Sequence, residues 1–117
     1  APQAWLLARR AEWRDELDRQ LPDALDLMAI CISAGSSFEG ALASVGTRMD
    51  GAIAEAFARV AKEAAYSSRS EALLGLADRA QVNSITFFTA SLVQAERAGS
   101  SLVDIIRRRS PSAPSAA

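Results

Sequence analysis

The chain has 117 residues, of which half are hydrophobic but only 6% are aromatic. This length allows one hydrophobic core and is too short for two, and a hydrophobic fraction made mostly of Ala, Leu, Ile and Val favours closely packed helices. Thirteen basic and fourteen acidic residues leave a formal net charge of −1. That balance excludes a general attraction to nucleic acid. We predict a single all-α bundle of about six or seven helices.

A charged helix over residues 4–19 is predicted first, with a sparse apolar stripe at Leu6, Trp13 and Leu17. Its two tryptophans predict either packing on the bundle or a surface that another segment covers. Pro22 is predicted to end this helix and to start the next, because proline disfavours helix at the preceding residue and suits a first helical position. The second helix, residues 22–34, is apolar on nearly every side, which predicts a central place in the bundle.

A corner is predicted after the second helix, at residues 34–37. Gly35 suits a left-handed helix stop, and Ser36 with Glu39 fits a capping box for a third helix that ends near Gly46. Four more helices are predicted: a fourth at residues 53–64, a fifth after Ser68, a sixth from residue 83 or 84, and a short seventh. Each of these helices, like the third, has one apolar stripe. The stripes are Phe38, Ala41, Leu42 and Val45; Ile53, Phe57, Val60, Ala61 and Ala64; Ala72, Leu73, Leu76, Ala77 and Ala80; Ile85, Phe88, Leu92 and Ala95; and Leu102, Ile105 and Ile106.

The Ala-Gly-Ser-Ser corner of residues 34–37 recurs at residues 98–101. The flanking apolar residues align as well, which indicates a duplicated helix-corner-helix unit. Gly35 and Gly99 are then both helix stops, and Ser36 and Ser101 are predicted corner serines. Met28 and Leu92 are expected at comparable depths.

The residue types that most often carry catalysis are scarce. The sequence contains no histidine and a single cysteine, Cys31. This excludes Ser-His and Cys-His catalytic arrangements, a disulfide within the chain, and a two-cysteine metal site. Residues 35–40 have the glycine spacing of a phosphate-binding loop, but Ala41 stands where the lysine is required and no strand precedes it. We predict no enzymatic activity, no cofactor and no metal.

Polar residues near the two corners are the candidate contact sites. Asp23 and Asp26 suit stabilisation of a helix N-terminus or contact with a basic partner, with a pair of catalytic carboxylates as a remote alternative. Gln94, Glu96 and Arg97 form a polar cluster beside the second corner, for which structural and partner-contact roles both stay open. The ladder Glu55, Arg59, Glu63 indicates a solvated helix face.

Several short segments together resemble the type II secretion system F domain: residues 21–29 (LPDALDLMA), 34–35, 40–42, 70–73 and 94–102. The opening Leu-Pro-Asp-Ala-Leu is most similar to the platform proteins of Tad (tight adherence) pili. The resemblance covers residues 21–108. It divides the chain into a charged amphipathic helix at residues 1–20 on the linker or membrane side, the F-like domain at 21–109, and a disordered tail at 110–117.

The resemblance implies a non-catalytic cytoplasmic domain of an inner-membrane platform protein, at the base of a pilus or secretion machine. Its implied partners are a hexameric secretion ATPase, which it couples to pilin assembly, and other platform subunits, with a second copy as a further option and no nucleic acid. The ATPase-facing surface is expected to include Asp23, Asp26 and the turn near Glu96 and Arg97. The family has membrane helices, whereas no stretch here reaches the roughly 18 apolar residues of a span, so we expect a soluble excised domain. The arginines at residues 107–109 would then precede a span. A free-standing helical adaptor is the alternative.

Overall fold

The computed structural model describes the backbone of residues 2–98 and the side chains of residues 4–95. This part of the chain forms five α-helices, α1 (Pro2–Ser33), α2 (Phe38–Arg48), α3 (Ala52–Tyr66), α4 (Arg69–Ala80) and α5 (Asn83–Ala98). No strand occurs between residues 2 and 98, so the all-α prediction is confirmed. The helix count is below six or seven because the first two predicted helices are one. The predicted seventh, like the tail at residues 110–117, lies outside the described residues.

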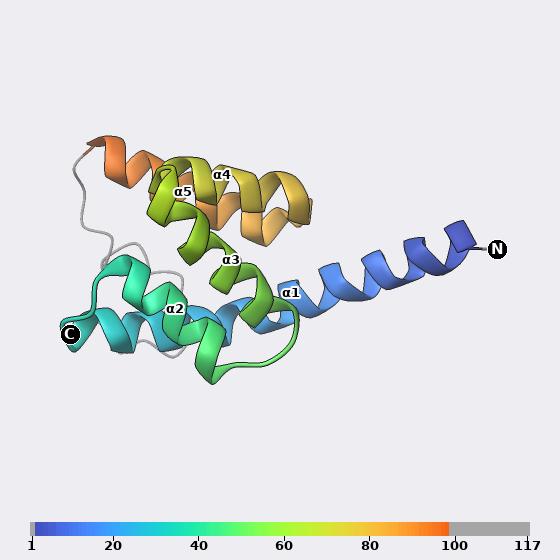
Figure 1. Ribbon diagram of the computed structural model, residues 1–117, viewed down its shortest axis with the longest axis horizontal. Helices are drawn as coiled ribbons and strands as arrows, with labels where there is room; N and C mark the ends of the chain where they lie inside the picture. Colours follow the sequence, from blue (N-terminus) through green and yellow to red (C-terminus); the bar gives the residue numbers. More distant parts are fainter. Residues whose placement is uncertain (1, 99–117) are drawn as a thin grey trace.

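The long helix α1 supports the other four. α2 packs on α1 and α3, α4 packs on α3 and α5, and α1 also contacts α3 and α5. Figure 1 shows α1 running along one side of the bundle, with α4 and α5 paired on the other side and α3 crossing between them. The first turns of α1 project beyond the bundle (Figure 1). Only the later part of this helix therefore contributes to the shared core.

Pro22 does not break α1, and the prediction of a corner there was wrong. A proline inside a helix costs about 3 kcal/mol because it removes one backbone hydrogen bond and its ring crowds the preceding turn. Burying one leucine contributes about 1.5–3 kcal/mol. The residues that share one face of α1 across the proline are all buried, and their combined burial outweighs that cost: Leu17, Leu21, Ala24, Leu25 and Met28.

The core is built from the predicted stripes of α2 to α5. The fully buried side chains with the largest volumes are Phe57 of α3 and Phe88 of α5. Their rings stack nearly parallel, with centroids 6.1 Å apart and an interplanar angle of 8°. Offset stacking of this kind adds about 0.5–1.5 kcal/mol to the burial of both rings. The two phenylalanines thus join α5 to α3 at the centre of the bundle.

The corner after α1 is confirmed, with one correction. Gly35 has φ +108°, its N–H donates to the Ile32 carbonyl at 3.0 Å, and the Ser36 N–H donates to the Cys31 carbonyl at 2.9 Å. These two bonds form a Schellman motif, which ends a helix at a left-handed residue. The helix stop at Gly35 is therefore confirmed, whereas Gly99 and Ser101 lie outside the described residues. Met28 and Leu92 are both fully buried, as the repeat predicted.

The N-cap of α2 is Ser37 rather than Ser36. The Ser37 hydroxyl accepts a hydrogen bond from the Gly40 N–H at 3.0 Å. Glu39, the expected partner of Ser36 in a capping box, pairs instead with Arg69 of α4 at 2.8 Å. The Glu39 carboxylate thus forms an ion pair between α2 and α4 instead of a capping box with Ser36. At α4 the N-cap is Ser68, whose hydroxyl accepts a hydrogen bond from the Glu71 N–H at 3.0 Å.

Gly46 does not end α2, which continues to Arg48. A Cβ atom at Gly46 would lie 2.8 Å from the Cβ of Ala58, so the glycine permits the close approach of α2 and α3. The expected solvated ladder on α3 is also only partly correct. Glu63 is half-buried and pairs with Arg59 at 3.7 Å and with Arg79 of α4 at 3.3 Å. Its carboxylate therefore links two helices.

Burial along α1 differs from the prediction at both ends. Trp13 is half-buried against the core, whereas Trp5 is 59% exposed and Leu6 is 54% exposed. Packing on the bundle therefore holds for Trp13 and fails for Trp5. Near the other end, Ile30 is 66% exposed. This part of α1 is apolar on nearly every side, but the bundle does not enclose it on every side as the sequence had predicted.

Candidate interaction surface

The predicted acidic pair lies in the middle of α1. Asp23 is exposed and Asp26 is half-buried. Because α1 begins at Pro2, neither carboxylate is near a helix N-terminus, and the capping role that the sequence favoured was wrong. A spacing of three residues places both on one side of the helix. Contact with a basic partner is the remaining predicted role that this position fits.

The second predicted cluster lies on α5. Gln94 is exposed, and the backbone of Glu96 and Arg97 belongs to the last turn of that helix, while both side chains lie outside the described residues. Figure 1 shows the C-terminal end of α5 on the opposite side of the bundle from α1. The structure therefore does not bring this cluster beside the acidic pair. A partner contacting both would have to reach around the molecule.

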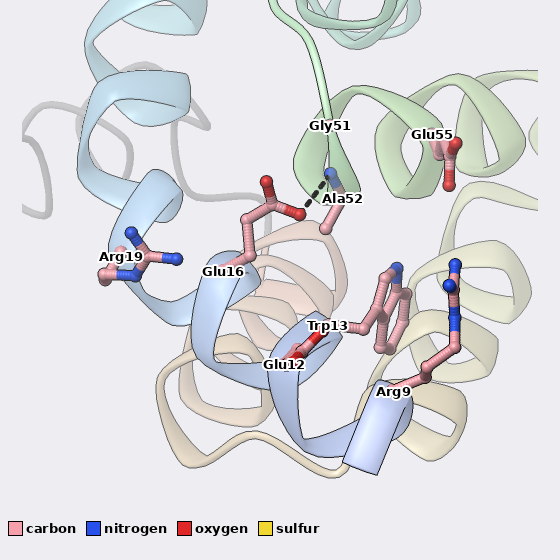
Figure 2. A pocket seen from close by; sticks show the side chains of 8 residues that line it. All are labelled: Arg9, Glu12, Trp13, Glu16, Arg19, Gly51, Ala52 and Glu55. Atoms are coloured by element: carbon pink, nitrogen blue, oxygen red, sulfur yellow. Dashed lines mark hydrogen bonds between the residues drawn. The ribbon is translucent and has the colours of Figure 1, made fainter. Parts of the chain in front are cut away.

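Polar residues in the middle of α1, which sequence reasoning did not single out, bind the ends of other helices. The N-cap of α3 is Gly51, which has no side chain to cap the first turn. Glu16 supplies the missing acceptor, since its Oε2 accepts from the Ala52 N–H at 3.1 Å (Figure 2). Gln20 accepts from the Ile53 N–H at 3.1 Å and donates to the Asp50 carbonyl at 2.9 Å. These contacts fix α3 on α1.

The same segment of α1 also holds the turn between α4 and α5. The Arg14 Nε–H donates to the Ala80 carbonyl at 3.2 Å, at the C-terminal end of α4. The Ser84 hydroxyl donates to Asp18 Oδ1 at 2.5 Å, at the start of α5. Residues 14–20 thus carry structural contacts. The charged side chains of Arg14, Glu16 and Asp18 therefore make contacts within the domain.

A cavity of about 500 Å³ opens between the N-terminal half of α1 and the first turns of α3. Figure 2 shows Arg9 and Trp13 reaching from α1 toward α3, with Glu16 hydrogen-bonded to Ala52 to the left of them. The cavity is lined by acidic and basic side chains around the indole ring of Trp13. The lining residues are Arg9, Glu12, Trp13, Glu16, Arg19, Gly51, Ala52 and Glu55. Among the described side chains, those of residues 4–95, no three of His, Cys, Asp or Glu are grouped to hold a metal ion.

A second cavity of about 510 Å³, more apolar, lies where α1 meets the start of α5. Its apolar lining comes from both sides of Pro22 and from the first turns of α5: Leu21, Pro22, Leu25, Phe87 and Phe88. Phe87 is 55% exposed at its edge. The described part of the domain therefore offers contact surfaces of different character along α1.

Taken together, these features define an all-α domain whose shorter helices pack along the long helix α1 and on one another. The chain belongs to the family of the type II secretion system (T2SS) protein F, whose family model matches residues 24–111. Members of this family are non-enzymatic platform components of secretion and related pilus machines in the inner membrane. The resemblance seen in the sequence is thus confirmed at the level of the family. No curated protein and no solved structure gives a significant match. Between residues 2 and 98, no helix combines the length and hydropathy of a membrane span.

Proposed function

We propose that this chain is a non-catalytic cytoplasmic domain of an inner-membrane platform protein, and that it couples a hexameric secretion ATPase to pilin assembly. The observation that carries the proposal is the family match over residues 24–111, which spans most of the chain. A platform domain acts through contacts and needs no nucleophile or metal. The family match also favours this function over a free-standing adaptor. The proposal keeps the division of the chain into segments at residues 20 and 109. It also keeps the other platform subunits as partners.

The Tad-type pilus is the machine that we propose within this family. The support is the opening of residues 21–25, Leu-Pro-Asp-Ala-Leu, and its setting in the fold. Leu21 and Leu25 are buried on either side of the half-buried Pro22, and Asp23 lies between them on the exposed side. The segment thus combines core residues with an exposed carboxylate. In this proposal, Leu21 and Leu25 stabilise the fold and Asp23 contacts the partner.

The side of α1 that carries the exposed Asp23 and the half-buried Asp26 is our proposed ATPase-facing surface. Its support is electrostatic, because residues in the middle of a long helix gain nothing from the charge of the helix end. Carboxylates at the rim of an interface steer a basic partner and raise the association rate. Gln94, Glu96 and Arg97 remain candidates for a second contact on another side.

The test is a binding assay of this chain against the ATPase of the same machine, with the variant Asp23→Lys/Asp26→Lys. A matched control is Asp50→Lys/Asp78→Lys, which changes the net charge equally through two exposed carboxylates elsewhere. We expect the wild-type chain and the control to bind and the α1 variant to bind at least ~10-fold more weakly. Equal binding by both variants would show that the ATPase contacts a surface other than this side of α1. No binding by any folded form would reject the proposed coupling.

A further inference from the structure

Three arginines and one indole ring line a cavity of about 400 Å³ between the N-terminal half of α1 and the C-terminal end of α4. Its lining residues are Arg10, Trp13, Arg14, Asp78, Arg79 and Gln81. We call it the arginine cavity. Its volume lies within the range of small-molecule sites, about 300–1,000 Å³. None of its residues belongs to the proposed ATPase-facing surface, so the cavity needs an explanation of its own.

The two arginines that α1 contributes lie on one side of the helix. Arg10, Trp13 and Arg14 are spaced by three and four residues, which places their side chains next to one another. Arg14 has a structural contact, because its Nε–H donates to the Ala80 carbonyl at 3.2 Å. Arg10 is exposed and takes part in none of the ion pairs among the described residues. Like charges one turn apart repel each other, so the fold gains nothing from the charge of Arg10.

The third arginine is held in place at the end of α4. Arg79 Nη1 lies 3.3 Å from Glu63 Oε1, and the Arg79 side chain is only 28% exposed. Its Nη2 is buried and has no hydrogen-bond partner among the described residues. A buried donor without an acceptor is unfavourable. An anion in the arginine cavity would bring acceptor oxygens to this guanidinium.

The balance of charge favours an anion in this cavity over the neighbouring one. Asp78 is the one carboxylate among the lining residues, against three arginines, of which one is paired with Glu63. The C-terminal end of α4 adds about half a negative charge, which one arginine offsets. The cavity beside α3 shares Trp13, but three glutamates outnumber two arginines in its lining (Figure 2). That neighbouring cavity therefore repels the anion that the arginine cavity attracts.

Each group in the lining can recognise one part of a nucleoside phosphate. Planar guanidinium groups bind phosphate oxygens through paired N–H donors. An indole ring offers a stacking surface for a nucleobase, whereas an acidic peptide would give it no flat ring to stack on. The Gln81 Nε2 donates to the Asp78 carbonyl at 2.8 Å, which leaves the side-chain oxygen of Gln81 as an acceptor for a base amino group. We propose that the chain binds a nucleoside phosphate in the arginine cavity, with the phosphates at the arginines and the base on Trp13.

The inference goes beyond the proposed coupling and is tested on the chain alone, by isothermal titration calorimetry with ADP, inorganic pyrophosphate and adenosine. ADP is expected to bind with a dissociation constant below about 1 mM. Pyrophosphate lacks the base and adenosine lacks the phosphates, so each should bind at least ~10-fold more weakly. Absence of ADP binding by the folded chain would overturn the inference. So would equal affinities for pyrophosphate and ADP, because the base would then add nothing.

Tryptophan fluorescence locates the bound base. The chain has two tryptophans, so Trp5→Phe leaves Trp13 as the sole indole, and Trp13→Phe leaves Trp5. A base stacked on Trp13 should quench the fluorescence of the first variant and leave that of the second unchanged. Quenching of Trp5 alone would place the ligand outside the arginine cavity and overturn the assignment.

Two matched pairs of variants test the electrostatics, with urea denaturation to show that each variant is folded. Arg10→Gln should weaken ADP binding about 10-fold, whereas Arg9→Gln, at the exposed neighbour that lines the other cavity, should change it less than ~2-fold. Asp78→Asn should tighten binding about 2–5-fold, whereas Asp15→Asn, at an exposed position outside the lining, should leave it unchanged. Equal effects within either pair would overturn the inference. A chain that binds ADP but not the ATPase would reject the proposed coupling alone.

Discussion

The Glu16 carboxylate of α1 accepts a hydrogen bond from the Ala52 N–H at 3.1 Å and so caps a helix that lacks a capping side chain of its own. Glu16→Ala would leave that part-buried N–H without its acceptor. We expect a loss of about 0.5–2 kcal/mol in the free energy of unfolding, measured by urea denaturation. Glu12→Ala, at an exposed position one turn earlier, is the control and should change stability by less than about 0.5 kcal/mol. Equal losses in the two variants would contradict the capping role.

Pro22→Ala should stabilise the domain. Proline costs about 3 kcal/mol relative to alanine inside a helix, and α1 continues through this position. Part of the gain is offset by the loss of contacts that the half-buried ring makes, so we expect about 1–2 kcal/mol of added stability in urea denaturation. If proline instead ended one helix and began another, the variant would be neutral or less stable.

Gly46→Ala should destabilise the contact between α2 and α3 by about 1–3 kcal/mol, because the new Cβ would lie 2.8 Å from the Cβ of Ala58. Adding Ala58→Gly should recover part of this loss. Gly75→Ala is the control, since its Cβ would meet only the flexible end of Arg79, at 3.2 Å. We expect that control to gain about 0.5–1 kcal/mol from helix propensity. A stable Gly46→Ala protein would show that the helices can separate at no cost.

Ser37→Ala and Ser36→Ala distinguish the two possible caps of α2. The Ser37 hydroxyl accepts from Gly40, so its removal should cost about 1 kcal/mol. Ser36 is exposed in the corner, and its removal should cost less than about 0.5 kcal/mol. Both losses would be read from thermal or urea unfolding of the purified chain. The reverse order would restore the capping box that the sequence suggested.

Apolar periodicity predicted the buried faces of α2 to α5 well, because each of these short helices has one stripe and one core to face. The prediction failed at Pro22, where a local preference of the backbone was given more weight than burial. The spacing from Leu17 to Leu21 and on to Met28 continues one helical face through the proline, and this was the signal that could have shown a single helix.

The residues that hold the helices together were harder to predict. Glu16 and Gln20 bind residues more than 30 positions away, and no local pattern announces such a contact. The indirect signal was Asp50-Gly51, a helix start whose glycine cannot cap. Of the predicted contact residues, Asp23 is exposed and available, but only binding can assign its partner.

The most direct test of the central claim is the affinity of this chain for the hexameric ATPase that we propose as its partner, measured by isothermal titration calorimetry without nucleotide, with ADP and with a non-hydrolysable ATP analogue. A domain that couples ATP hydrolysis to assembly must bind the nucleotide states with different free energies, and a coupling of 1–3 kcal/mol corresponds to roughly 5–150-fold in affinity. We predict binding with a ratio in that range between two of the states. Absence of binding, or one affinity in all three states, would contradict the account.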